Sequence, residues 1–446
     1  MDRRNFIKFA GLTSVMGSLP TAFQIRAGQA DFNGKFLITV QAEGGWDVSS
    51  LCDPKMNVPG EAQINHWAIN DETRTAGNIQ YAPFANNISF FEKYHNDMLI
   101  INGIDSQTNS HTAGVVHNWS GRISNGFPTL TALYAASNAP NLPISYINNG
   151  GYAETAGIIR YSRLDNPDSI KNIVEPNRNV WNPQESWNPE RDWDLVNATR
   201  SNVMADKLNK TNLTFRERLA ISNYKSSLEN ASILKDFNDG LSNAGEFEEG
   251  VQKTNFWSSL KQQAQLALIA MNTGVAVSAD LIVGGAFDSH QFHDRDQEES
   301  LEVTTDGLDY IWEFAERLGI ADRLVVVVNS DFGRTPYYNV TEGKDHWPVG
   351  SAIIMERNVP WGNRTVGLTD QEQNVIPINP LTLQPQENGG SIIYPKHVMQ
   401  SLRDYMGIGN NPLVTPFTFN NDETFDFFSA TKATPQGQDV RNSVRV

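Results

Sequence analysis

The sequence predicts an α/β fold with a doubly wound, mostly parallel sheet flanked by helices. Short, fully apolar runs bounded by Gly, Asn and Asp alternate with longer segments whose apolar residues recur at helical spacing. Several runs are rich in β-branched residues and do not alternate with polar ones, as expected of strands covered on both faces. Carboxylates directly follow three of these runs, at the position where ligands bind in open α/β sheets.

Six strands and five helices are expected along the chain. The strands cover residues 36–42, 98–103, 144–148, 279–284, 324–329 and 352–355. The helices cover residues 88–95, 213–241, 256–271, 301–318 and 395–406. Apolar residues repeat at three- and four-residue spacing from Leu308 to Leu318, which predicts that this helix packs one face against the sheet.

Residues 160–210 have a different composition, rich in Asn, Trp, Pro and Asp. The tetrapeptide Val-Trp-Asn-Pro around Trp181 is echoed by Ser-Trp-Asn-Pro around Trp187. We expect an insertion or cap on one domain that spans residues 31–446. It is interpreted either as a Trp-lined lid over a substrate cleft or as peripheral packing of a long loop.

Composition and charge exclude several classes of protein. Of 446 residues, 39% are hydrophobic and 19% charged, which is incompatible with a largely disordered chain. The net charge of −16, from 35 basic and 51 acidic residues, disfavours binding to nucleic acid or to anionic lipid. The single cysteine, Cys52, rules out an intramolecular disulfide and a Cys-rich zinc site.

The N-terminal residues resemble a twin-arginine export signal. Arg3 and Arg4 are followed by Phe, Ile and Lys and then by a mildly apolar run, which is too short to span a bilayer stably. Small residues at positions 28 and 30 predict cleavage after Ala30, which leaves 31 basic and 50 acidic residues and a net charge of −19. We therefore expect residues 1–30 to be a signal read by the Tat translocase. The mature protein is expected to be periplasmic or secreted, without stable membrane insertion.

Carboxylates and imidazoles gather in the loops that follow the expected strands. These residues are Asp47, Asp288, His290, His293, Asp331, Asp345 and His346. The carboxyl ends of parallel strands meet at one edge of a sheet, so the side chains can converge there. Hard carboxylates with a few imidazoles suit Zn, Mn, Mg or Ca. The chain has no Gly-rich phosphate loop after any strand, which disfavours nucleotide-dependent classes.

Several blocks of sequence resemble the bacterial domain of unknown function 1501 family. They are residues 44–47, 287–290, 322–336 and 343–348. The resemblance extends over most of residues 31–410, apart from the Trp-rich insertion. That family is similar to the alkaline phosphatase and sulfatase superfamily. The similarity implies a doubly wound sheet and, usually, two divalent metals beside a Ser, Thr or Cys nucleophile.

The resemblance assigns roles to the loop residues. Asp47 matches the first metal carboxylate of the superfamily. Asp288, with His290 or His293, is similar to the Asp and His pair that holds one metal, and His346 resembles the late histidine that completes this site.

One position departs from the superfamily pattern. Asp331 matches the Asp of an Asp-His-Gly element, but Phe332 stands at the His position. Because phenylalanine cannot ligate, a second metal would keep only Asp47, Asp331 and the nucleophile oxygen, unless Asp345 joins them. The expected cofactor is one or two divalent ions, with one site better supported than two.

The nucleophile is expected at the helix that follows the strand 98–103. Backbone N–H groups and the helix dipole there can stabilise an oxyanion. Ser110 is the first choice and Thr112 the reserve, although Ser110 also fits as a helix N-cap. His111 could face the site or pack under it. Arg334 could bind a substrate oxyanion or pair with a neighbouring carboxylate.

Two functions follow from this resemblance and these residues. The first is metal-dependent hydrolysis of an anionic phosphate or sulfate ester, with attack by a Ser or Thr hydroxyl. The second is a catalytically degenerate secreted binding or assembly protein that retains the fold and one structural metal. Phe332 favours the second function, and the cluster of carboxylates and histidines favours the first.

Overall fold

The computed structural model describes most of the chain after the expected signal. The described residues are 32–150, 152–164, 171, 174–182, 184–210, 212–214, 217–218, 220–221, 231–243, 259–284, 287–420 and 423–429. The expected export signal lies outside them. Among the helices in these ranges, none is both long enough and apolar enough to cross a membrane.

A central sheet of eight strands organises the described residues. In spatial order the strands are β12 (Arg364–Val366), β4 (Met98–Asp105), β11 (Val349–Glu356), β8 (Leu324–Ser330), β1 (Phe36–Ala42), β7 (Ser278–Val283), β5 (Tyr146–Asn148) and β6 (Tyr161–Ser162). β11 runs antiparallel to β4 and β8, and the other neighbouring pairs are parallel. β1, β8 and β7 are buried along their whole length, as their apolar runs predict.

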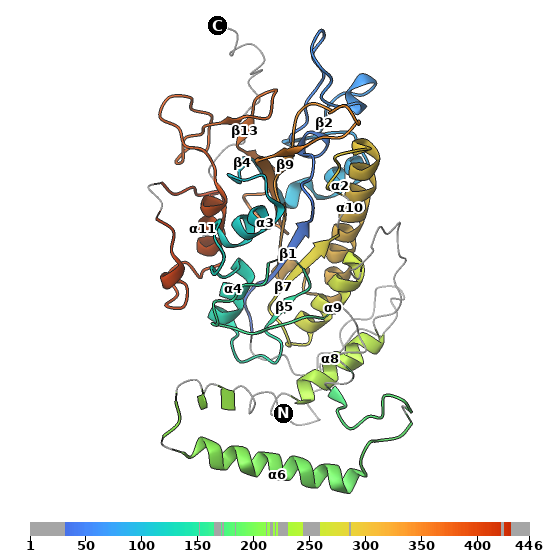
Figure 1. The fold of residues 1–446 in the computed structure, drawn as a ribbon, viewed down its shortest axis with the longest axis vertical. Coiled ribbons are helices and arrows are strands. Elements are labelled where there is room, and N and C mark those ends of the chain that lie inside the picture. Colours follow the sequence, from blue (N-terminus) through green and yellow to red (C-terminus); the bar gives the residue numbers. More distant parts are fainter. Residues whose placement is uncertain are drawn as a thin grey trace, which may run out of the picture.

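Helices cover both faces of this sheet (Figure 1). One layer contains α2 (Asn87–Tyr94), α9 (Leu260–Asn272) and α10 (His293–Leu318). The other layer contains α3 (His111–Ser120), α4 (Leu130–Asn138) and α11 (Pro395–Tyr405). The predicted α/β class with a mostly parallel sheet between helices is confirmed.

Short elements complete the described fold. Two-stranded sheets pair β9 (Gly333–Arg334) with β10 (His346–Trp347), β13 (Leu368–Thr369) with β14 (Val375–Ile376), and β2 (Arg74–Ala76) with β3 (Ile79–Tyr81). Turns of 3₁₀ helix cover Val48–Ser50, Trp67–Ile69, His95–Asp97, Ala321–Arg323 and Thr415–Phe417.

The elements differ from the sequence prediction in a few places. α10 begins at His293, eight residues before the predicted start at residue 301, because its first turn is acidic and carries no apolar periodicity. Asp294 and Asp296 in that turn suit the positive end of the helix dipole. α4 was not predicted, since seven of its nine residues are buried and no polar face marks it as a helix. Of the predicted helix 213–241, the described part includes α8 (Ala231–Asn243).

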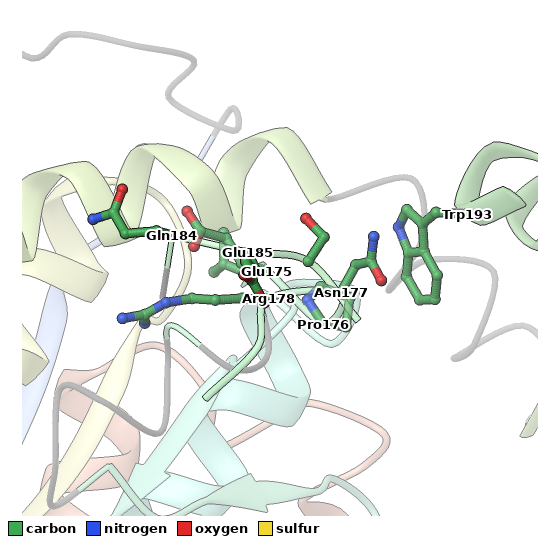
Figure 2. A pocket seen from close by; sticks show the side chains of 9 residues that line it. Glu175, Pro176, Asn177, Arg178, Gln184, Glu185 and Trp193 are labelled. Atoms are coloured by element: carbon green, nitrogen blue, oxygen red, sulfur yellow. The ribbon is translucent and has the colours of Figure 1, made fainter. Parts of the chain in front are cut away.

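The Trp-rich segment contains the long helix α6 (Glu190–Leu208). Trp181 is 86% exposed, and a pocket of about 300 Å³ is lined by Trp193 and by residues 174–178 and 184–186. Figure 2 shows Trp193 at one end of this group and Gln184 at the other. In Figure 1, α6 lies at the bottom of the molecule, whereas α3 lies near the middle and β9 towards the top. The segment is therefore far from the sheet edge that carries the carboxylates.

His397 in α11 predicts a pH-dependent stability. Burial lowers the pKa of this imidazole to about 4, and Nδ1 accepts the N–H of Tyr394 at 3.1 Å in a capping box. The folded protein therefore holds His397 neutral, whereas the unfolded chain protonates it near its ordinary value. Its contribution is complete above about pH 6.5 and is lost as the pH falls towards 4, by about 3 kcal/mol.

The measurement is urea unfolding at pH 7 and at pH 4.5. His397→Gln should retain the cap, because a Gln side chain also accepts at this position, and should show a smaller loss of stability in acid than the wild type. His95→Gln, at the end of α2, is the control and should leave the loss unchanged. An equal acid sensitivity in all three proteins would contradict the assignment to His397.

Candidate metal centre

The ends of three neighbouring strands bring the site loops to one edge of the sheet. Ala42 at the end of β1 pairs in register with Val283 of β7 and Ser330 of β8. The three strands therefore end level, and the loops that carry Asp288 and Asp331 begin side by side.

The small sheet of β9 and β10 adds the late residues to this edge. His346 pairs with Arg334 in its register. The backbone of the same loop is joined to the loop of Asp288, since Lys344 N donates to Ser289 O at 3.1 Å and His293 N donates to Glu342 O at 2.9 Å. These bonds hold together residues that are 49 and 55 positions apart in the chain.

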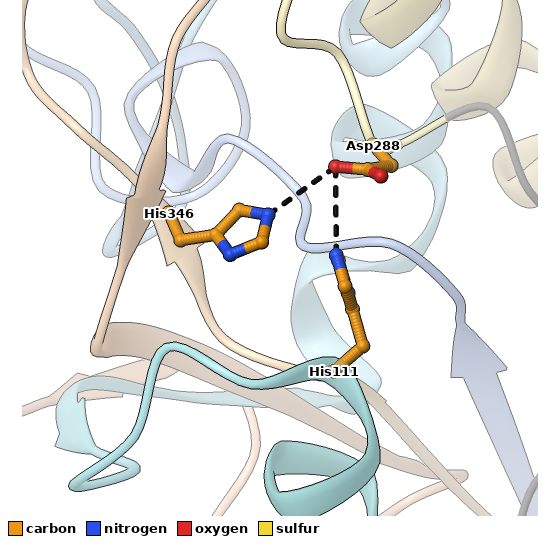
Figure 3. Close-up of side chains that lie close together, drawn as sticks. All are labelled: His111, Asp288 and His346. Atoms are coloured by element: carbon orange, nitrogen blue, oxygen red, sulfur yellow. Dashed lines mark hydrogen bonds and ion pairs between the residues drawn. The ribbon is translucent and has the colours of Figure 1, made fainter.

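Three residues at this edge have the arrangement of metal ligands (Figure 3). One ligand atom from each of His111, Asp288 and His346 lies within 4.8 Å of the others. Nε2 of His111 lies 3.5 Å from Asp288 Oδ1, and Nε2 of His346 lies 3.4 Å from the same oxygen. His290 points to the same place, with Nε2 3.2 Å from Asp288 Oδ1 and 2.9 Å from His346 Nε2.

The other nitrogen of each imidazole is bonded to an oxygen acceptor. Nδ1 of His111 lies 2.6 Å from Asp331 Oδ2, and Nδ1 of His290 lies 2.7 Å from Asp345 Oδ1. Nδ1 of His346 lies 2.8 Å from the carbonyl oxygen of Asn109. Each Nδ1 can therefore donate a proton to its oxygen, and in the neutral form of each imidazole Nε2 is the atom that would present a lone pair towards Asp288. Second contacts of this kind orient histidine ligands in metal sites.

These four residues fit a divalent cation. In the neutral form of the three imidazoles, the Nε2 lone pairs would repel one another, and a cation between them would remove this repulsion. His111 Nε2 is buried and has no hydrogen-bond partner among the described residues. The separations of 2.9 to 3.5 Å resemble the roughly 3.3 Å between ligands in a tetrahedral zinc site with bonds of about 2.0–2.1 Å.

Phe332 forms an apolar wall of this centre. Its ring is 1% exposed and lies 4.9 Å from the ring of His111 and 4.6 Å from that of His346, measured between centroids. A histidine here would add a ligand. Phenylalanine instead packs against two of the imidazoles and limits their rotation.

Arg334 pairs with a carboxylate, the second of its two predicted alternatives. Its guanidinium is buried and lies 2.8 Å from Asp288 Oδ1. Other N–H groups donate to the carbonyls of Gly44, Gly45 and Lys344. Burial would raise the pKa of Asp288, but the hydrogen bond and charge of Arg334 lower it. Arg334 thus keeps Asp288 ionised and fixes the loop after β1.

Asp47 and His293 lie in a separate, buried cluster. Asp47 Oδ2 lies 2.6 Å from Lys344 Nζ and 2.8 Å from His293 Nε2. Between His290 and His293, the structure therefore directs the first to Asp288 and the second to Asp47. Asp331 contacts His111, and Asp345 contacts His290, so both carboxylates lie behind the imidazoles.

Ser110 and Thr112 are exposed at the beginning of α3. Ser110 has the backbone position of an N-cap, but its hydroxyl accepts no cap bond from the helix among the described residues. The neighbouring residues Asn109 and His111 both contact the candidate centre. The hydroxyl of Ser110 is therefore free of a capping role, and Ser110 immediately precedes His111 in the chain.

Three further residues complete the comparison with the sequence. The sequence left open whether His111 faces the site or packs under it, and the structure shows that it faces the centre. The feature of the sequence that pointed to this position is that His111 begins a helix that follows a buried strand. His117 is buried, and its Nδ1 lies 2.9 Å from Ser106 O. Lys344 was not anticipated, because a lysine between a glycine and an aspartate carries no signal of burial.

The fold and this edge define a doubly wound α/β protein whose histidines and carboxylates gather at the ends of the central strands. The chain belongs to the family described as protein of unknown function, DUF1501, whose model matches residues 34–370. This match confirms the family suggested by the sequence blocks. Among curated proteins no match is found.

Solved structures to which the chain is similar include three from bacteria. PsFucS1 sulfatase from Pseudoalteromonas sp. is 10% identical, with coverage of 90% of this chain and 74% of that chain and a TM-score of 0.40. A protein in the alkaline phosphatase superfamily from Vibrio parahaemolyticus is 9% identical, with 84% and 67% coverage and a TM-score of 0.35. The lipoteichoic acid synthase LtaP from Listeria monocytogenes is 12% identical, with 96% and 80% coverage and a TM-score of 0.33.

Proposed function

We propose that this protein is a metal-dependent hydrolase of phosphate or sulfate esters. The observation that carries the proposal is the convergence of three imidazole Nε2 atoms on Asp288 Oδ1. The free hydroxyl of Ser110 lies next to His111 in sequence, at the N-terminus of a ten-residue helix. A candidate cation site beside a hydroxyl at a helix N-terminus suits attack on an anionic ester.

His111, Asp288, His290 and His346 are the residues that would hold the metal. Three imidazoles with one carboxylate favour zinc over the oxygen-preferring Mg and Ca. When bound, the ion would supply a positive charge that stabilises the oxygens of the ester and lowers the pKa of a nearby hydroxyl.

The chain's own groups account for the remaining steps. Ser110 Oγ attacks the phosphorus or sulfur atom and loses its proton to water, and the ester oxygen leaves with the bonding electrons and takes a proton from water. A second water then cleaves the new bond to Ser110 and releases phosphate or sulfate. The first N–H groups of α3 stabilise the negative oxygens. Thr112, also in the first turn of α3, is the alternative nucleophile.

Export is part of the proposal. The paired Arg3 and Arg4 support recognition by the Tat translocase, and the anionic ester would then be met in the periplasm or outside the cell. Charge on the mature chain is strongly negative, so attraction of an anionic substrate depends on the bound cation.

Ser110→Ala is expected to lower the turnover of an aryl phosphate or aryl sulfate by at least about 100-fold. Its zinc content should equal that of the wild type, because Ser110 is not one of the four ligands. Thr112→Ala is the matched variant, with an expected change in turnover of less than about threefold. The measurement is release of the aryl alcohol by zinc-loaded protein, together with elemental analysis.

The outcome separates the two functions. Loss of turnover in Thr112→Ala alone would move the nucleophile to Thr112. Absence of turnover in a zinc-loaded wild type over both ester classes would instead favour the binding protein, in which the ion is structural. Phe332 favours this second function, because it stands where the superfamily has a ligating histidine and a phenylalanine cannot bind a metal.

A further inference from the structure

A second charged cluster lies next to the candidate centre and is sealed from solvent. The side chains of Asp47 and Lys344 are 0% exposed, and that of His293 is 1% exposed. Lys344 precedes Asp345 and His346 in the chain, and His293 follows His290 by three residues. Buried charges need complete pairing, so the partners of these groups decide what the cluster can hold.

All three N–H groups of Lys344 have acceptors. Nζ lies 2.6 Å from Asp47 Oδ2, 3.3 Å from Ser49 Oγ and 3.3 Å from Asn65 Oδ1. An ammonium has three donors and no acceptor, so its hydrogen-bonding capacity is used completely. A carboxylate, a hydroxyl and an amide oxygen around one positive atom are the same groups that surround a bound cation.

His293 presents a proton to this cluster. Burial lowers the pKa of His293, so the imidazole is neutral. Nδ1 lies 2.8 Å from Ser289 Oγ, which can donate to it, and Nε2 lies 2.8 Å from Asp47 Oδ2, which can only accept. Nε2 therefore carries the proton and has no lone pair for a metal.

The remaining oxygen of Asp47 is also satisfied. Oδ1 accepts the backbone N–H of Ser49 at 2.9 Å and the hydroxyl of Ser49 at 2.6 Å. One carboxylate is thus balanced by one ammonium and three further hydrogen bonds. A divalent ion added here would place two uncompensated positive charges beside Lys344 in a buried space, at a large electrostatic cost.

We infer that the ammonium of Lys344 is the resident cation of the Asp47 cluster, so that the metal centre of this protein holds one ion. This inference rests on the proposed function for the identity of that one site. Asp47 is then a positioning residue. Through Lys344 and His293 it ties together the two loops that carry Asp288, His290 and His346.

The zinc content of the purified protein measures the number of ions in the metal centre directly. Protein is stripped with a chelator, equilibrated with excess zinc chloride, desalted and analysed for zinc per chain. The wild type should hold one zinc and His346→Ala none. The double variant Asp47→Asn/Lys344→Met removes both buried charges together and should still hold one zinc.

The variant Lys344→Ala tests the cluster as a cation site. Without the ammonium, the oxygens of Asp47, Ser49 and Asn65 can accept an added ion, so the protein should gain a second zinc. The variant Lys344→Ala/Asp47→Asn is its control and should return to one. If Lys344→Ala does not fold, the wild type and the charge-free double variant still decide the number of ions.

The outcomes separate this inference from the proposed function. Two zinc ions in the wild type, one of them lost in Asp47→Asn/Lys344→Met, would overturn the inference and leave the function standing. A folded Lys344→Ala without extra zinc would overturn the role of Lys344 as a cation. A wild type without zinc would overturn the proposed centre, whereas a zinc gained only by Lys344→Ala would still support the cation role of Lys344.

Discussion

His346→Ala is expected to lower the affinity for zinc by at least about 100-fold, since even groups that only orient a ligand contribute about 10- to 100-fold. The substitution removes an imidazole whose Nε2 lies 3.4 Å from Asp288 Oδ1 and 2.9 Å from His290 Nε2. It leaves the buried Arg334 paired with Asp288, so a large loss of stability is not expected. Competition with a chromophoric chelator measures the affinity.

Asp345→Asn is expected to lower the affinity for zinc by less than His346→Ala does. Its carboxylate lies 2.7 Å from His290 Nδ1 and contacts the ligand rather than the ion. A loss of about 10- to 100-fold is therefore expected, smaller than that of His346→Ala. His95→Ala, a histidine at the end of α2, serves as the control and should bind zinc as the wild type does. Equal affinities in His346→Ala and His95→Ala would rule out the proposed centre.

Gly343→Ala is expected to disrupt the same centre without removing any ligand. A Cβ at this position would lie 1.8 Å from the carbonyl oxygen and 2.0 Å from the carbonyl carbon of His290. These are backbone atoms, and the same carbonyl accepts hydrogen bonds from Asn339 Nδ2 and Thr341 Oγ1. The two loops must therefore separate. We expect a loss of about 1–3 kcal/mol in the free energy of unfolding and about a tenfold loss of zinc affinity.

Gly350→Ala is the matched control, because it is a nearby glycine with room for a methyl group. The nearest atoms to its added Cβ are 3.5 Å away, which is ordinary van der Waals contact. Thermal unfolding and zinc titration of both variants check the prediction. If Gly343→Ala behaved like Gly350→Ala, the close approach of the two loops would not limit the site.

The sequence predicted the central strands and the carboxylates that follow them. Strands covered on both faces are continuous apolar runs, and these runs placed β1, β7 and β8 within one or two residues of their observed ends. Asp331 directly follows β8 and Asp288 lies in the loop after β7, so topology alone brings them to one edge. His346 was found through the family resemblance rather than through any pattern of its own.

The sequence could not predict which residue each side chain of the site contacts. His290 and His293 are three residues apart and chemically identical, yet one faces Asp288 and the other Asp47. The turn at Phe292, with a φ of 51°, separates the two directions. Arg334 offered two roles of equal merit, and only the positions of three carbonyl groups and Asp288 selected one.

The chain's local patterns therefore determined its class, its strands, its family and the edge where chemistry can occur, because burial and periodicity are properties of neighbouring residues. The tertiary structure decided which of these groups lie together. His111, Asp288, His290 and His346 meet from three segments of the chain, and Lys344 reaches Asp47 across almost 300 residues. Contacts of that range depend on backbone register and on close packing such as that of Gly343 against the His290 carbonyl group, and no local pattern encodes them.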